Sequence, residues 1–154
     1  MRDLEGPTEL PQLPDGFRYR TVGADDVPER VSIHREVWAP SRVTKSSYAQ
    51  VRAEWPYRAS LDCIVQAPDG PVAAYCLCWP DDMHRVGEFD PRGPAGVPPS
   101  RARRRRPHVR THATYEESGR QAIAYCASAP ACELYQSLGF RIHASLVGYG
   151  RPAR

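Results

Sequence analysis

The chain has 154 residues and a formal net charge of +3, a size that fits one domain with one core. Six arginines between residues 101 and 110 exceed the net charge by themselves, so no general basic face of a nucleic-acid-binding domain is indicated. No apolar run follows Met1, and none reaches the roughly 18 residues of a membrane helix. We therefore expect a cytoplasmic protein with neither a signal peptide nor a membrane span.

The first part of the chain predicts one strand and one helix after an irregular start. Residues 1–16 are polar and contain three prolines, which predicts a lead-in arm without regular structure. Residues 17–22 alternate aromatic or branched residues with arginine, as in a half-buried strand. Residues 27–38 have apolar residues at helical spacing and an early proline, and they follow a capping acid, Asp25 or Asp26. This pattern predicts a helix.

A second helix and a hairpin follow. Thr44 carries a hydroxyl that can cap a helix, and Pro56 ends the helical pattern. Residues 61–67 and 72–79 are apolar and rich in strand formers, and the Pro-Asp-Gly-Pro sequence at 68–71 is a strong turn signal. These two segments predict an antiparallel pair.

The last third of the chain is interrupted by a tract rich in proline, glycine and arginine, residues 92–119. It shows no hydrophobic period, and we expect an irregular basic loop there. Regular structure is predicted on both sides of it. The predicted elements are a strand at 85–89, a strand at 121–126, a helix at 130–138 capped by Gly139, and strand material at 140–144 and 146–149.

The five cysteines are scattered through apolar segments, without a paired CxxC and without histidine at ligand spacing. This pattern predicts buried, reduced thiols and no metal site. The residues concerned are Cys63, Cys76, Cys78, Cys126 and Cys132.

The order of predicted elements, β-α-α-β-β-β-gap-β-α-β, is that of an α+β domain with a mixed sheet. Within it, the last helix carries Ala131-x-x-Leu134-Tyr135-x-x-Leu138-Gly139-Phe140. Together these features resemble the GNAT superfamily of acetyl-CoA-dependent N-acetyltransferases. The resemblance implies a mixed, mostly antiparallel sheet of six to seven strands flanked by helices. It gives a single GNAT-like domain at 17–150, preceded by the arm and followed by a tail at 151–154.

The resemblance also implies a loop of the form RxxGxG after the family's fourth strand, where helix N–H groups bind the pyrophosphate of CoA. In this chain Gly93 and Gly96 do not have that spacing, and nearby prolines remove donors. Residues 96–103 can be encoded so that dropping one base gives Ala-Phe-Arg-Arg-Arg-Gly-Leu-Gly, which has the expected form. We therefore hypothesise that the tract is an out-of-frame version of the loop, which the coding DNA between Asp90 and Gln121 would test.

Two residues are candidates for acid–base catalysis. Glu88 lies on the strand before the phosphate loop, where we expect it to be partly buried beside Phe89 and to take a proton from an amine. An exposed edge-strand carboxylate is the alternative. Tyr135 lies in the helix motif, where the resemblance implies a general acid for the departing CoA thiolate, and a core residue is its alternative. Asp81 and Asp82 fit either an amine-binding role or a polar turn.

The resemblance further implies cofactor contacts along the strand and the following loops. The candidate cofactor-binding residues are Phe89, Asp90, Pro91, Ser128, Arg103 and Arg104. Ser128 stands where relatives often have asparagine, and the arginines are suited to phosphate oxygens. The histidines His84, His108 and His112 are dispersed without partner spacing and are expected to be solvated.

The resemblance thus implies transfer of an acetyl group from acetyl-CoA to a primary amine of a small molecule or peptide. Without the phosphate loop, we expect impaired activity and poor affinity for CoA. The alternative is an inactive GNAT-like binding module whose basic loop contacts an acidic partner. Specific nucleic-acid binding is not favoured, because no aromatic platform accompanies the arginines. The acceptor and the oligomeric state, including a homodimer, are left open.

Overall fold

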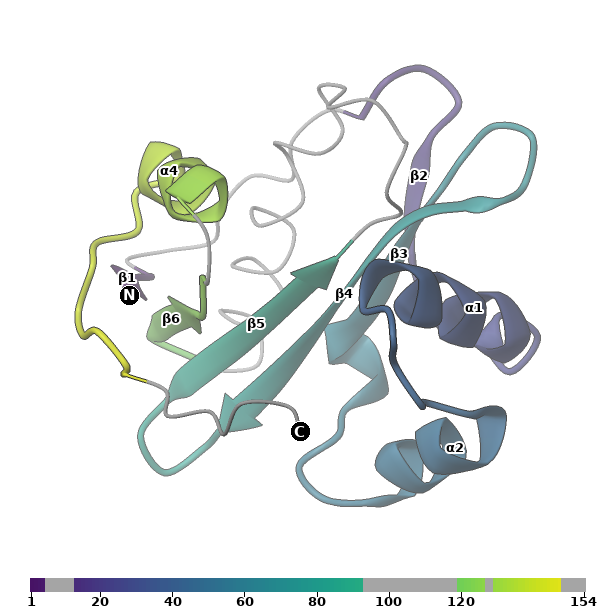
Figure 1. Cartoon of the computed structure of the whole chain (residues 1–154), viewed down its shortest axis with the longest axis horizontal. Coiled ribbons are helices and arrows are strands. Elements are labelled where there is room, and N and C mark those ends of the chain that lie inside the picture. Colours follow the sequence, from purple (N-terminus) through teal and green to yellow (C-terminus); the bar gives the residue numbers. More distant parts are fainter. Residues whose placement is uncertain (5–12, 93–118, 127–128, 148–154) are drawn as a thin grey trace, which may run out of the picture.

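The computed structural model describes residues 1–4, 13–92, 119–126 and 129–147, with the backbone alone for residues 90–92. Its described strands form one six-stranded sheet in the order β1-β6-β5-β4-β3-β2 (Figure 1). The elements are β1 Arg2–Asp3, β2 Arg18–Thr21, α1 Val27–Val37, α2 Lys45–Ala53, the 3-10 helix η1 Ala59–Leu61, β3 Asp62–Gln66, β4 Val72–Asp81, β5 Val86–Arg92, β6 Gln121–Ala124 and α4 Ala129–Ser137. Neighbouring strands are antiparallel except β5 and β6, which are parallel. The predicted α+β class with a mixed, mostly antiparallel sheet is confirmed.

Helices cover the two faces of this sheet, and strand alternation divides the core between them. On one face Cys76, Cys78 and Phe89 pack in the same cluster as Tyr135 of α4. On the other face Tyr75 packs with Ile33 of α1. Figure 1 shows α1 and α2 together on the right of the sheet and α4 on the left.

The end of α4 explains why its sequence motif has this form. Gly139 has φ +83°, a left-handed conformation that glycine adopts without the cost of a Cβ. The Gly139 N–H donates to the Gln136 carbonyl and the Phe140 N–H donates to the Tyr135 carbonyl, both at 3.0 Å, which is the Schellman pattern. The Tyr135 and Phe140 rings then meet edge to face at 5.3 Å between centroids. The predicted glycine cap is confirmed.

The two N-terminal helices begin in different ways. Thr44 caps α2 as predicted, with a reciprocal capping box to Ser47. Asp26 precedes α1 but makes no side-chain cap. Its carboxylate instead accepts from both terminal guanidinium nitrogens of Arg20 and, at 2.7 Å, from the Gly23 N–H. The predicted capping role of this acid is therefore wrong, because Arg20 on β2 competes for it.

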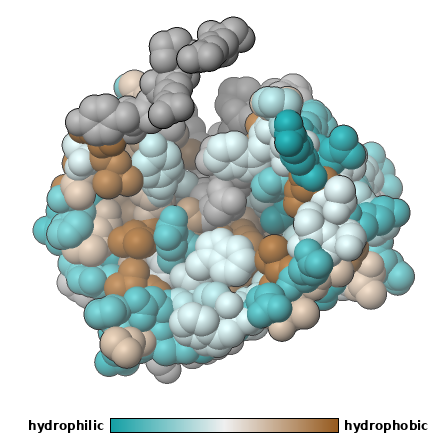
Figure 2. Space-filling view, turned by 60° about the horizontal axis from the view of Figure 1, so that its bottom comes forward, coloured by the Kyte–Doolittle hydropathy of each residue, from teal (hydrophilic) through white to brown (hydrophobic). Residues whose placement is uncertain are grey.

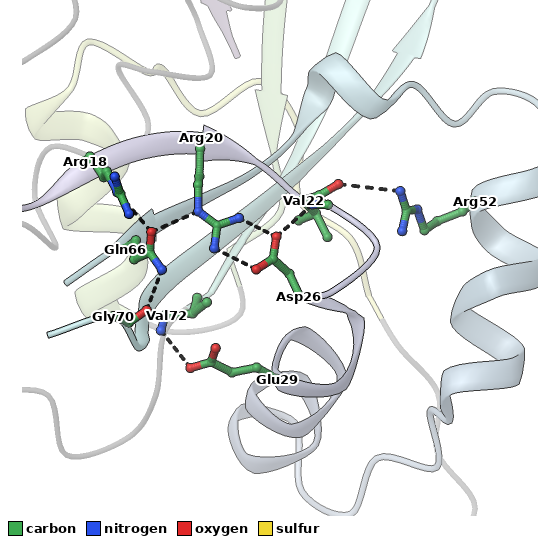
Figure 3. Close-up of polar contacts among 10 residues, drawn as sticks. Arg18, Arg20, Val22, Asp26, Glu29, Arg52, Gln66, Gly70 and Val72 are labelled. Carbon is green, nitrogen blue, oxygen red and sulfur yellow. Dashed lines mark hydrogen bonds and ion pairs between the residues drawn. The ribbon is translucent and has the colours of Figure 1, made fainter. Parts of the chain in front are cut away.

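Figure 3 shows that the same arginine connects α1 to the hairpin. Gln66 accepts from the Nε atoms of both Arg18 and Arg20 at 3.0 Å and donates to the Gly70 carbonyl at 2.6 Å. Glu29 accepts from the Val72 N–H at 2.7 Å. These bonds fix the start of α1 against the turn that the sequence predicted between β3 and β4.

The two ends of the described chain correct two expectations. The expected irregular arm contains β1, which pairs antiparallel with β6. The expected strands at 140–144 and 146–149 are not formed as far as Val147, and residues 148–149 lie outside the described residues. Arg141 exchanges two backbone bonds with Met1, but within the described residues no strand lies beside the segment that follows. Ile142 and Leu146 consequently remain exposed.

The cysteines correct a third expectation. Cys126 and Cys132 form a disulfide with a Cα–Cα distance of 5.5 Å, which is within the range that such a bond requires. Cys63, Cys76 and Cys78 are thiols, as expected, and the last two are buried. In the described part of the chain, no helix is long and apolar enough to cross a bilayer.

Candidate functional site

The candidate site is the point where the parallel ladder between β5 and β6 ends. The two strands pair from Val86↔Gln121 to Phe89↔Ala124. Beyond Phe89, β5 continues to Arg92 along β4, whereas β6 has already ended at Ala124 (Figure 1). Among the described residues, no strand pairs with this edge of β5 beyond Phe89. An extended ligand with amide groups can hydrogen-bond to such edges.

Glu88 lies on this part of β5 and faces the α1 and α2 side of the sheet. Its ladder partners are Trp79 on β4 and Ile123 on β6, both half-buried, while Glu88 itself is exposed. The expectation that Glu88 is buried beside Phe89 is therefore wrong, since successive strand residues point to opposite faces. An exposed carboxylate at this position is open to a solvent-borne amine.

Phe89 and Tyr135 lie together on the opposite face. Phe89 is 3% exposed and Tyr135 is 8% exposed, in one cluster with Phe140. The Phe89 and Phe140 rings meet edge to face with centroids 6.3 Å apart. The helix cap described above thus places the candidate acid, Tyr135, behind the strand that carries Glu88.

Of the remaining cofactor-binding candidates, the structure describes only the backbone of two and none of the others. Asp90 and Pro91 belong to β5 and pair with Leu77 and Cys76 of β4. Their backbone forms the part of β5 that continues past the last pair with β6. Ser128, Arg103 and Arg104 lie outside the described residues, as does the whole expected loop between 93 and 118. Their assignment to cofactor binding stays a prediction.

The acidic pair in the β4–β5 turn is engaged within the protein. Asp81 accepts from the His84 N–H at 3.0 Å and contacts its Nδ1 at 2.7 Å, and these hydrogen bonds lower the pKa of Asp81. Asp82 forms an ion pair with Arg58, with contacts of 2.6 and 2.7 Å. Of the two alternatives, the polar turn accounts for both residues. Among the described residues no cluster suited to a metal ion occurs.

The sequence interpretation missed a buried charge cluster beneath α1 and α2. Asp62 is fully buried and accepts from the hydroxyls of Tyr48 and, at 3.2 Å, Tyr57. Arg30 lies 3.7 Å from its other oxygen and stacks 3.5 Å from the centre of the Tyr75 ring. Burial, reinforced by the Asp62 charge, raises the pKa of both tyrosines. A lone aspartate in the apolar run at 61–65 was the available signal.

The space-filling view shows one hollowed region of the surface (Figure 2). Figure 2, seen from the end bearing the β4–β5 turn, shows the molecule hollowed between its α4 side on the left and its α1 and α2 side on the right. Brown and pale side chains lie around the hollow, and hydrophilic ones form much of the outer rim. Surfaces of mixed apolar and polar character in a concave region are typical of ligand sites.

No family model and no curated protein matches the sequence. Solved structures match its fold at low identity. A GCN5-related N-acetyltransferase from Sphaerobacter thermophilus is 17% identical with a TM-score of 0.68, covering 90% of this chain and 45% of that protein. The ribosomal-protein-alanine N-acetyltransferase from Brucella melitensis is 16% identical with a TM-score of 0.63, covering 80% and 84%.

A third structure carries a ligand. AAC(6')-Iy, in complex with the bisubstrate analogue CoA-S-monomethyl-acetylneamine, is 13% identical with a TM-score of 0.65 and covers 89% of this chain and 99% of that one. The chain thus spans less than half of the Sphaerobacter protein but nearly the full length of AAC(6')-Iy. The fold that the sequence motif implied is confirmed, and the described structure has the GNAT fold of these N-acetyltransferases.

Proposed function

We propose that this protein is a GNAT-type N-acetyltransferase that transfers an acetyl group from acetyl-CoA to a primary amine. One observation carries the proposal: the β5–β6 ladder ends between an exposed carboxylate on one face and a buried phenol on the other. The ladder stops at Phe89↔Ala124, with Glu88 on the α1 and α2 side and Tyr135 behind Phe89 on the α4 side. A thioester held along the opening would lie between a base and an acid.

The chain's own groups account for the proton transfers. Glu88 would accept a proton from the substrate ammonium before attack, or from the amine nitrogen as it bonds to the thioester carbon, directly or through one water. Backbone N–H groups at the open strand edges would stabilise the oxyanion that develops on the thioester carbonyl. When the C–S bond breaks, Tyr135 would protonate the departing thiolate and regain its proton from solvent. Holding the thioester against the amine would supply most of the rate gain.

The acceptor is a primary amine on a small molecule or peptide. Solved structures of the same fold include a spermidine N-acetyltransferase chimera and a ribosomal-protein-alanine N-acetyltransferase, so the fold accommodates both kinds of acceptor. In this chain the buried Arg30, Tyr48 and Asp62 join α1, α2 and β3. We infer that this cluster fixes the wall on the Glu88 side of the sheet, against which an acceptor would lie.

Two measurements test the proposal. Isothermal titration with acetyl-CoA should give a dissociation constant below about 1 mM, the upper end of typical enzyme Michaelis constants. A thiol-release assay with a panel of primary amines should then show turnover. Glu88→Gln and Tyr135→Phe should each lower kcat by about 10²-fold or more.

Matched controls separate catalysis from a general effect of substitution. Glu133→Gln changes an exposed carboxylate on α4, and Tyr19→Phe changes a tyrosine on β2, at the far edge of the sheet. Both controls should retain kcat within about twofold. Absence of acetyl-CoA binding would refute the enzymatic proposal and favour the alternative, an inactive GNAT-like binding module.

A further inference from the structure

The disulfide between Cys126 and Cys132 joins two elements that border the strand opening. Cys126 follows the end of β6 by two residues, and Cys132 lies at the end of the first turn of α4. Ala124 is the last β6 residue paired with β5. The bond therefore connects the strand at the point of opening to the neighbouring helix.

The same helix carries the candidate acid. Cys132 and Tyr135 are three residues apart on α4, so they lie on neighbouring positions of one helix face. Cys126 and Leu134 both pack against the cluster that contains Tyr135 and Phe89. A change in the link at Cys132 is thus transmitted to the helix that positions Tyr135.

The two bonded sulfurs are also more accessible than most of the chain's thiols. Cys126 and Cys132 are half-buried, whereas Cys76 is 5% exposed and Cys78 is fully buried. Cys63, which is half-buried on β3, sits away from α4 and provides a natural control. Thiol–disulfide exchange depends on access of the attacking thiolate, and the half-buried pair offers that access.

We propose that Cys126 and Cys132 form a reversible redox switch that ties the end of β6 to α4 and thereby sets the affinity for acetyl-CoA, an inference that rests on the proposed function. Oxidation by a small disulfide converts two protein thiols into one protein disulfide and releases two small thiols. A dithiol reductant reverses the exchange, restoring both protein thiols and becoming a cyclic disulfide. The oxidised form holds α4 to β6 before the ligand arrives, which lowers the entropy cost of binding.

The first experiment follows the bond itself. The full chain is equilibrated in glutathione buffers of graded potential, alkylated, and mapped by peptide mass spectrometry. Cys126 and Cys132 should become labelled together as the buffer becomes more reducing, while labelling of Cys63 should not depend on the buffer. Alkylation of either residue under fully oxidising conditions overturns the switch.

The second experiment follows its effect. Titration with acetyl-CoA should show roughly fivefold weaker binding to the reduced protein, the loss expected when about one more side chain must be ordered on binding. The Cys126→Ser/Cys132→Ser double variant should bind like the reduced protein and ignore the buffer, whereas Cys63→Ser should respond like the original chain. Equal affinity of the two redox forms overturns the coupling to the cofactor.

Hydrogen exchange separates this inference from the proposed function. Amides within 121–126 and 129–135 should exchange faster after reduction, even in the absence of ligand. If neither form binds acetyl-CoA, the enzymatic proposal fails, and a redox-dependent protection of this segment still supports the switch at the junction. Unchanged protection would overturn it.

Discussion

Replacing Asp62 by asparagine should lower the free energy of unfolding by about 3 kcal/mol or more, because it leaves the buried Arg30 charge without its counterion. Asp62 is fully buried, and the Arg30 side chain is 4% exposed with its Nε 3.7 Å from the carboxylate. Removing one partner of a buried ion pair typically costs about 3–5 kcal/mol. The Tyr75 ring lies 3.5 Å from the guanidinium. In the variant it still stabilises the Arg30 charge through a cation–π contact worth roughly 1–2 kcal/mol.

Urea denaturation followed by circular dichroism measures this loss as a shift in midpoint at constant slope. Asp82→Asn is the matched control, because Asp82 also pairs with an arginine, Arg58, but on the surface with both side chains at least 31% exposed. Exposed pairs contribute about 0–1 kcal/mol. The two aspartates should therefore differ by more than about 2 kcal/mol.

A double variant distinguishes an unpaired charge from a general packing defect. Arg30→Met with Asp62→Leu removes both charges and should be more stable than Asp62→Asn alone, since apolar replacements of whole buried pairs are often neutral or stabilising. The reasoning fails if Asp62→Asn costs less than about 1 kcal/mol. It also fails if the double variant loses as much stability as Arg30→Met and Asp62→Leu measured singly and added together.

Three further predictions concern local contacts. The pKa of Asp26 is lowered chiefly by its hydrogen bonds from Arg20, so its stabilising contribution is complete above about pH 4, the unfolded value, and is lost as the pH falls through the folded value. The melting temperature should accordingly drop less on acidification in Arg20→Met than in the original chain. Gly139→Ala should cost about 1–2 kcal/mol, because the φ of +83° forces a left-handed alanine, and Gly139→Asn should cost less in the same urea assay. Thr44→Ala should cost about 1 kcal/mol by removing the cap of α2, and a loss no larger than that of Ser46→Ala would contradict it.

The sequence predicted elements well where the signal is local. The turn at 68–71, the Thr44 cap and the glycine end of α4 each depend on residues a few positions apart, and the structure has all three. The expected strand at 140–144 also has a local alternating pattern, but a strand needs a neighbour. That neighbour depends on contacts between distant segments. Among the described residues, the Arg141 backbone bonds to Met1 and its side chain pairs with Asp3, but no strand lies beside the segment that follows. The two residues of β1 are too few to show a pattern in the sequence. They form a strand because they pair with the edge of β6.

The candidate site was predictable in part for the same reason. The motif suggested Tyr135 and the strand suggested Glu88 as candidates, but the face on which each side chain lies follows from the register of the whole sheet. Cys126 and Cys132 carried no CxxC signal, and their pairing depends on how the end of β6 lies beside α4. Asp62 was visible as a lone charge in an apolar run, but its partners Arg30 and Tyr48 come from two different helices.

The alternation along β5 links these findings to the proposed chemistry. Glu88 and Phe89 are consecutive, so they necessarily face opposite sides of the sheet, and a base and a buried acid on opposite faces cannot reach one substrate through a continuous ladder. The ladder with β6 ends at the very next step, after Phe89↔Ala124, and in the proposed mechanism one extended ligand would reach both faces at this point. Replacing Ala124 by proline should leave the predicted acid and base in place. It should disturb the end of the β6 strand, because proline lacks a backbone N–H donor. Loss of acetyl-CoA binding in Ala124→Pro with retained folding would support the opening as the binding element, and unchanged binding would refute it.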